Sequence, residues 1–205
     1  MTHGPMTPSP GNDPVMGGQS KSTFALDQGG SGGMFAGTCA VVPFLKAPGF
    51  CKVETTGGSF PDASAYFSGS LAMRVRSTTP TYAGFKVAFG ATGATRPAGT
   101  GTHHGGATFK APFQLRGSGW QVVKIPFSQF SIDWSDYTGS CSTKDPTGVQ
   151  HHCCTAAHPE VCVQLRHLKA VTSLGVWAEG VEGTFDLDID WIGADESADV
   201  GVSQD

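Results

Sequence analysis

Residues 183–192 alternate apolar and polar side chains more strictly than any other part of the chain. One face carries Phe185, Leu187, Ile189 and Trp191, and the other carries Asp186, Asp188 and Asp190. Successive side chains of a β-strand point to opposite faces of the sheet, so the pattern predicts a strand with one buried and one solvent-exposed face. The aspartates then keep the outer face soluble. The alternative is that one of them joins Asp13 or Glu54 in a calcium site.

The same period of two recurs in shorter segments. It is clear at residues 71–76, 85–89, 123–125 and 174–176, and further strands are expected at residues 22–26, 38–42, 50–54 and 108–113. The 29 glycines and 13 prolines among 205 residues favour turns over helices. The best helix candidate is one or two turns at residues 159–169. Roughly nine short strands with Gly-rich turns are typical of an all-β jelly roll or β-sandwich.

The two ends of the chain differ in composition from the part between them. Residues 1–11 contain three prolines and are expected to form an extended tail. Residues 195–205 are small, polar and acidic, and are expected to form a flexible tail. The sequence therefore predicts one jelly-roll domain over residues 12–194, with a Cys/His-rich insert at residues 140–162.

Charge and motifs exclude several classes of function. A formal net charge of −4 argues against nucleic-acid binding. No apolar run approaches the ~18 residues that a transmembrane helix needs. The first residues show no secretory signal, so we expect that any targeting peptide has been removed or was never part of this sequence. There is no nucleophile elbow, phosphate loop or dinucleotide-binding fingerprint, and the Gly-rich stretch at residues 99–106 is interpreted as a hairpin loop. We therefore expect no catalytic residues, no cofactor and no enzyme activity.

The cysteines suggest disulfides and an oxidising compartment. There are six: Cys39, Cys51, Cys141, Cys153, Cys154 and Cys162. Their even number suits three bridges. Cys39 and Cys51 bracket two adjacent predicted strands and are expected to pair. Cys141 is expected to pair with either Cys153 or Cys154, which leaves the other for Cys162, and the bridges would hold the insert in one shape.

A zinc site is the alternative interpretation of the insert. Its cysteines lie close in sequence to His151, His152 and His158, and thiolate and imidazole are the ligands that zinc prefers. The spacing lacks paired Cys-x-x-Cys knuckles, however, and adjacent ligands rarely reach the same ion. The sequence therefore favours disulfides and no bound metal.

Several segments, in order along the chain, resemble signature segments of the complex I intermediate-associated protein 30 family. They are Asn12-Asp13-Pro14-Val15-Met16-Gly17-Gly18-Gln19-Ser20, Ala47-Pro48-Gly49-Phe50, Leu71 to Arg76, Trp120 with Ile125-Pro126-Phe127, and Gly183-Thr184-Phe185 through Trp191-Ile192. The resemblance implies a galactose-binding-like jelly roll. It also implies a role in assembling or stabilising respiratory or photosynthetic complexes, whereas related jelly rolls bind carbohydrate. The insert at residues 140–162 is a departure from the family.

Candidate binding residues follow from the predicted strands. Arg74, Arg76 and Lys86 are expected to share an outward sheet face, with Tyr82 near the strand end. The aromatic rings of Trp134, Tyr137 and Trp177 are candidate platforms for stacking on sugar rings. A second candidate surface is the insert itself, which disulfides would present rigidly to a protein partner.

These observations predict a non-catalytic accessory or assembly subunit that binds other proteins of a multi-subunit respiratory or photosynthetic complex. The expected address is an oxidising compartment, with the chloroplast thylakoid lumen favoured. The alternative function is a carbohydrate-binding module in a secreted or lumenal protein.

Overall fold

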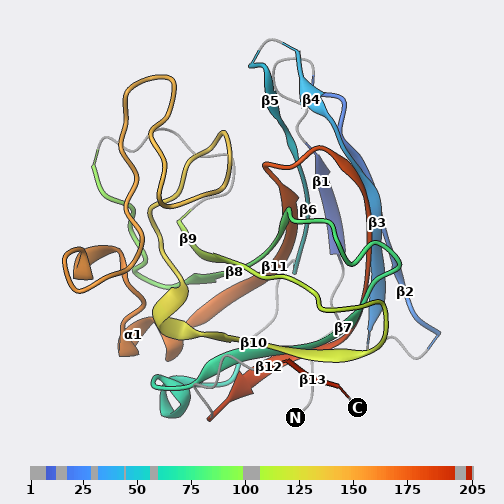
Figure 1. Ribbon diagram of the computed structural model, residues 1–205. Helices are drawn as coiled ribbons and strands as arrows, with labels where there is room; N and C mark the ends of the chain where they lie inside the picture. Colours follow the sequence, from blue (N-terminus) through green and yellow to red (C-terminus); the bar gives the residue numbers. More distant parts are fainter. Residues whose placement is uncertain are drawn as a thin grey trace.

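A computed structural model describes residues 8–12, 18–28, 32–43, 45–55, 60–98, 107–196 and 202–204. Its strands form two antiparallel sheets that face each other (Figure 1). The five-stranded sheet has the order β1 (Pro8–Asn12), β6 (Phe50–Thr55), β11 (Val171–Glu179), β8 (Phe85–Ala91) and β9 (Thr108–Pro112). The six-stranded sheet has the order β13 (Val202–Gln204), β10 (Gln121–Pro126), β7 (Ser70–Arg76), β12 (Gly183–Asp195), β3 (Gly33–Cys39) and β2 (Lys21–Leu26). The predicted jelly-roll β-sandwich is confirmed.

Helical structure is sparse, as the composition indicates. The described residues contain the 3-10 turns η1 (Ser64–Tyr66), η2 (Phe127–Gln129) and η3 (Pro159–Val161) and one short helix, α1 (Leu165–Leu168). The last two fall within the segment predicted to be helical. A small ladder pairs β4 (Val41–Val42) with β5 (Ala47–Pro48). No helix in the described ranges is long and apolar enough to cross a membrane.

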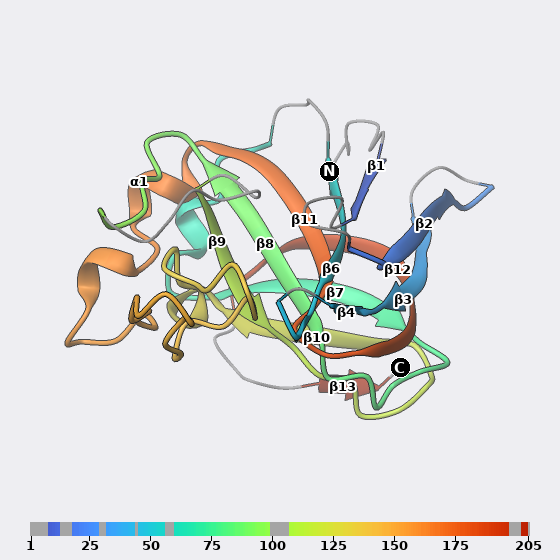
Figure 2. The ribbon, with the colours of Figure 1, turned by 90° about the horizontal axis from the view of Figure 1, so that it is seen from above.

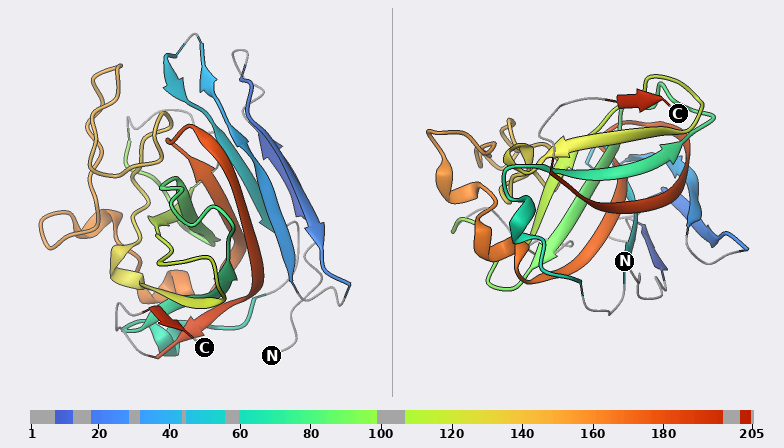
Figure 3. Two further views of the ribbon diagram at one scale, coloured as in Figure 1. Left: turned by 45° about the vertical axis from the view of Figure 1, so that its right-hand side comes forward. Right: turned by 90° about the horizontal axis from the view of Figure 1, so that it is seen from below.

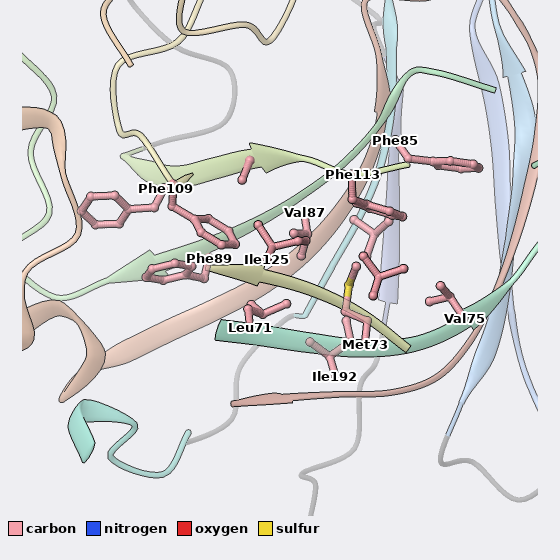
Figure 4. Packing of buried hydrophobic residues seen from close by; sticks show 14 of the residues in the cluster. Leu71, Met73, Val75, Phe85, Val87, Phe89, Phe109, Phe113, Ile125 and Ile192 are labelled. Atoms are coloured by element: carbon pink, nitrogen blue, oxygen red, sulfur yellow. The ribbon is translucent and has the colours of Figure 1, made fainter. Parts of the chain in front are cut away.

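The core lies between the two sheets and is built by the alternation seen in the sequence. Apolar residues of β7 (Leu71, Met73, Val75) face those of β8 (Phe85, Val87, Phe89), and all six side chains are buried (Figure 4). Phe35 and Phe185 meet across β3 and β12 with ring centroids 4.9 Å apart. Burial of these apolar side chains, at about 1.5–3 kcal/mol each, is what holds the sheets together.

Strand β12 departs from the predicted alternation near its end. A bulge lies between Ile189 and Trp191, and it shifts the pairing of β12 with β7. Ile192 therefore faces the core in place of Trp191, which is half-buried. The prediction that Trp191 shares the core face was wrong, because the extra residue of a bulge reverses the facing of the residues that follow.

Both predicted tails contribute residues to strands. β1 includes residues 8–11 and pairs with β6, β12 continues to Asp195, and β13 pairs with β10. Strand pairing uses backbone groups that every sequence carries, which is why composition did not indicate it. Most of the opening motif, residues 13–17, and the Gly-rich stretch 99–106 lie outside the described residues.

The Cys/His-rich insert lies beside β8 and β9, whereas β2 forms the opposite rim of the sandwich. The yellow-to-orange loops and the blue strand keep these places in all the ribbon views (Figures 1, 2 and 3). The insert is anchored to the edge of the five-stranded sheet through Ser131, which bridges to Cys162 of the insert and forms backbone hydrogen bonds with Lys110 of β9.

Candidate functional site

The outer face of the five-stranded sheet carries charged and aromatic residues that are buried. Because β8, β9 and β11 direct Phe85, Phe109 and Ala178 into the core, their alternate residues point outward. The outward residues include Lys86, Lys110, Trp177 and Glu179, all of which are buried. The insert and the segment before it cover this part of the sheet, and Trp134 from that segment is also buried.

The centre of this face is a cluster in which two lysines share one carboxylate. Glu179 Oε2 lies 2.6 Å from Lys110 Nζ and 3.8 Å from Lys86 Nζ. The Lys86 ammonium also donates hydrogen bonds of 2.9 Å to the carbonyl oxygens of Thr138 and Glu179. Burial lowers the pKa of Lys110 to about 8 and also lowers the pKa of Lys86, although Glu179 opposes both shifts. The cluster thus holds a surplus of positive charge in a dry environment.

Two tryptophans pack against cations of this face. Lys110 Nζ lies 3.6 Å from the ring centroid of Trp134 and 3.7 Å from that of Trp177. The Arg96 guanidinium packs on Trp134 at 4.2 Å, and Lys52 Nζ lies 5.0 Å from Trp177. Cation–π contacts of this kind stabilise desolvated cations. The indole rings therefore stabilise the buried cations, and neither ring has a face open to a ligand.

A second buried network holds the insert in shape. The ring of His151 lies between two carboxylates, with Nδ1 2.7 Å from Asp133 Oδ1 and Nε2 2.9 Å from Asp145 Oδ2. The other oxygen of Asp133 accepts a 2.8 Å hydrogen bond from the backbone N–H of His152. The Ser135 hydroxyl donates to Asp145. These contacts hold residues 145–152 of the insert against residues 133–135, which precede it.

Two disulfides close the insert. Cys141 pairs with Cys153, and Cys154 pairs with Cys162, which is one of the two pairings that the sequence left open. The cysteines of the insert are therefore not available as zinc ligands. No group of at least three His, Cys, Asp or Glu side chains in the described part of the chain is arranged to hold a metal ion.

The predicted Cys39–Cys51 disulfide is wrong. Both residues are buried thiols. Cys39 Sγ donates to the carbonyl oxygen of Gly49 at 3.0 Å, and Cys51 Sγ donates to that of Thr38 at 3.7 Å. The two cysteines belong to different sheets, β3 and β6, and a thiol that is buried and hydrogen-bonded to backbone behaves as a small apolar core residue.

The predicted binding residues do not form one surface. Arg74 and Arg76 lie on the outer face of the six-stranded sheet, where they pair with Asp190 at 2.9 Å and Asp188 at 2.6 Å. Both guanidinium groups pack on Trp120, at 4.8 and 4.7 Å from its ring centroid. The aspartates of β12 thus neutralise the arginines of the neighbouring strand.

Lys86 and Tyr82 lie elsewhere, so the expectation of a shared face was wrong. Lys86 belongs to the other sheet and is buried under the insert. Tyr82 packs in the core, donates to the carbonyl oxygen of Val181 at 2.9 Å, and has its pKa raised by burial. Tyr137 is half-buried beside Thr138. Strand alternation alone does not say to which of two sheets a strand belongs.

The aspartates proposed for calcium have other roles in the structure. Asp186 accepts hydrogen bonds from the backbone N–H and hydroxyl of Thr78, and Glu54 pairs with Lys52 at 3.0 Å. Asp13 lies outside the described residues.

Sequence reasoning missed the partners that make the cluster. Arg96, Lys110 and Glu179 were not singled out, and neither was Asp145 of the second network. A usable signal was present: Lys110 lies directly between Phe109 and Ala111 in a strand, and Glu179 ends an apolar run. A charged side chain between apolar strand residues needs a partner of opposite charge when the outer face of the sheet is also covered.

The fold and the site define a disulfide-stapled β-sandwich whose five-stranded sheet is capped by its own insert. The chain belongs to the complex I intermediate-associated protein 30 (CIA30) family, whose model matches residues 9–142. The match ends at the start of the insert, so most of the insert lies beyond it.

Solved structures give further likenesses at low identity. A family 11 carbohydrate-binding module from Clostridium thermocellum, in complex with a beta-1,3-1,4-mixed-linked tetrasaccharide, is 16% identical with a TM-score of 0.48, over 92% of this chain and 88% of that one. An exo-beta-agarase is 11% identical with a TM-score of 0.41, over 91% of this chain and 23% of that one. No curated protein matches the chain.

Proposed function

We propose that this chain is a non-catalytic accessory or assembly subunit that docks to other proteins through its insert. Membership of the CIA30 family supports a role in the assembly of a protein complex. The docking surface is assigned to the insert because of how the insert is held together. Two disulfides and the Asp133–His151–Asp145 network hold it in one shape, while its outer residues remain exposed.

The exposed residues suit contact with a protein. They include Ser142, Lys144, Thr147 and Gln150 on one arm and Thr155, Ala156, Ala157 and Glu160 on the other. They mix polar, charged and small apolar groups, as the polar rim of a protein interface does. A surface that is already rigid loses little conformational entropy when a partner binds, so each contact contributes more to affinity.

The finer assignment is to a respiratory or photosynthetic complex in an oxidising compartment, with the thylakoid lumen favoured and a secreted location as the alternative. The two disulfides support an oxidising compartment, because such bridges are rare where glutathione keeps thiols reduced.

The alternative of a carbohydrate-binding module has less support from the geometry. Stacking on sugar needs an open ring face, but Trp134 and Trp177 are 2% and 3% exposed and pack against cations. Trp120 packs against two arginines. A screen against oligosaccharides is expected to give no binding; binding that Trp134→Ala abolishes would favour the alternative.

The docking proposal is tested by changing the surface of the insert. The variant K144E/T147R alters two exposed side chains outside the buried network. We expect it to fold normally and to lose its protein partners when it is purified from the source cells. The control, Q114R/R116E, makes matched charge changes at exposed residues outside the insert and should retain the partners. Retention of the partners by both variants would contradict docking through the insert.

A further inference from the structure

The two sheets have four edges among the described residues, and three of them are protected. β1 contains Pro8 and Pro10, which have no N–H to donate. β9 continues through Lys110 into a bridge with Ser131. β13 spans only three residues. Natural sheets use such devices to prevent edge-to-edge pairing.

The fourth edge, β2, lacks these protections. It runs over six residues, contains no proline and pairs with β3 without a bulge. Figure 3 shows it in blue at the rim of the sandwich, and Figures 1 and 2 place it there as well. Leu26 at its end is 47% exposed. An edge of this kind is suited to pairing with another strand.

The pairing of β2 with β3 shows which backbone groups point outward. Asp27 donates its backbone N–H to the carbonyl oxygen of Gly32, opposite it, at 3.0 Å. In an antiparallel ladder, residues whose backbone N–H and C=O groups bond to one neighbouring strand alternate with residues whose backbone groups point away from that strand. The N–H and C=O groups of Ser22, Phe24 and Leu26 therefore point toward the open edge.

The side chains of β2 separate into two faces. Phe24 packs against the core, so Ser22 and Leu26 share its face. Lys21 and Asp27 lie on the outer face, at opposite ends of the strand, and both are exposed. They are roughly 20 Å apart along an extended strand and do not reach each other within one chain.

We infer that two copies of this chain pair through β2, antiparallel, with Phe24 on the two-fold axis. In this register Ser22 lies opposite Leu26 of the second copy, so the outward backbone groups form about six N–H···O bonds. Lys21 lies opposite Asp27 of the second copy, and the symmetry makes this ion pair twice. Leu26 gains cover from the second copy.

Other registers of the two β2 strands give fewer favourable contacts. A shift that places Thr23 on the axis sets Lys21 opposite Ala25, and it gives fewer backbone bonds. A shift by one residue would set opposite faces of the two strands against each other. The charge pattern thus selects both a second copy as the occupant and the register in which it binds. This self-association uses the rim opposite the insert and is independent of the proposed docking.

Charge exchange tests the proposal in the full chain. Sedimentation equilibrium should show a reversible dimer for the natural protein. K21E and D27K should each raise the dimer Kd about tenfold, because two attractive pairs become repulsive. The double variant K21E/D27K restores opposite charges across the axis and should recover dimerisation. A monomer at concentrations up to about 1 mM, or no recovery in the double variant, would overturn the proposal.

Cysteine exchange tests the register. Thr23 and Ala25 of the second copy form a non-hydrogen-bonded pair, whose Cα atoms lie about 4.5 Å apart and are within reach of a disulfide. An oxidised mixture of T23C and A25C chains should give a covalent dimer. Either variant alone should not, because its new cysteine lies opposite a different residue. A covalent dimer from T23C alone would show the other register and overturn the one inferred.

Discussion

Lys110 Nζ lies 2.6 Å from Glu179 Oε2, with the two side chains 1% and 3% exposed. Lys86 Nζ approaches the same oxygen at 3.8 Å. One buried carboxylate therefore faces two ammonium groups on what would be the open face of a simple sandwich. The burial depends on the insert and its flanking segment, since Trp134 packs on Lys110 and Thr138 accepts a hydrogen bond from Lys86.

Replacing Glu179 should destabilise the fold strongly. Glu179→Gln keeps the shape but removes the carboxylate that contacts both lysines. We expect the free energy of unfolding to fall by about 3–5 kcal/mol, because a buried charge that loses its counter-charge is costly. Urea unfolding monitored by tryptophan fluorescence measures the loss.

The matched control is Glu54→Gln, which removes a carboxylate from the more accessible Lys52–Glu54 pair on the same sheet. Such pairs contribute about 0–1 kcal/mol. Similar losses in Glu179→Gln and Glu54→Gln would show that the buried cluster does not stabilise the fold.

The stability of the protein should rise with pH on the alkaline side. Burial lowers the pKa of Lys110 from its ordinary value of 10.5 to about 8 in the folded protein. Between these two values Lys110 binds more protons in the unfolded chain than in the folded one, so its contribution to stability increases as the pH rises from about 8 to 10.5. Lys110→Met should remove this contribution. Unfolding of both proteins at several pH values across the window provides the measurement, and an identical pH dependence in the two would refute the assignment to Lys110.

The disulfide pattern predicts a definite thiol count. Under denaturing conditions without reductant, two thiols should react, and mass spectrometry should place the label on Cys39 and Cys51 alone. Peptides that contain the Cys141–Cys153 and Cys154–Cys162 links should remain joined. A count of zero reactive thiols would mean that Cys39 and Cys51 form a disulfide. A count of six would mean that the insert contains no disulfides.

Removing one disulfide of the insert should loosen the insert before it loosens the β-sandwich. The Cys141–Cys153 bridge closes a loop with a sequence separation of 12 residues, for which chain entropy gives a stabilisation of about 3 kcal/mol. In the variant C141S/C153S, limited proteolysis should cut within residues 140–162 earlier than in the natural protein. Earlier cleavage in β7 or β8 instead would indicate that the bridge stabilises the whole fold.

The sandwich could be predicted from the sequence because alternation reports which side chains of a strand face the core. The apolar residues of the strands at 71–76 and 85–89 face the core as the alternation predicts. The bulge after Ile189 was not predictable, since a bulge is a pairing defect that leaves no mark in the period of the residues. The disulfide at Cys39 and Cys51 was wrong because closeness of two predicted strands does not decide whether they lie in the same sheet.

The site was harder to predict because it depends on one segment covering another. Lys86 and Trp177 were recognised as outward residues. Whether an outward residue is exposed to solvent depends on where the insert lies, and no sequence pattern indicates the path of the insert. The His151 network illustrates the same limit. Its partners Asp133 and Asp145 are 18 and 6 residues away, and no local motif links them.

Docking through the insert is tested most directly by cross-linking in the native source, followed by mass spectrometry. Lys144 is exposed on the insert and accepts an amine-reactive cross-linker. The account predicts links from Lys144 to residues of another protein that co-purifies with the chain. Recovery of the chain without other proteins, with Lys144 linked to nothing beyond its own chain, would contradict it.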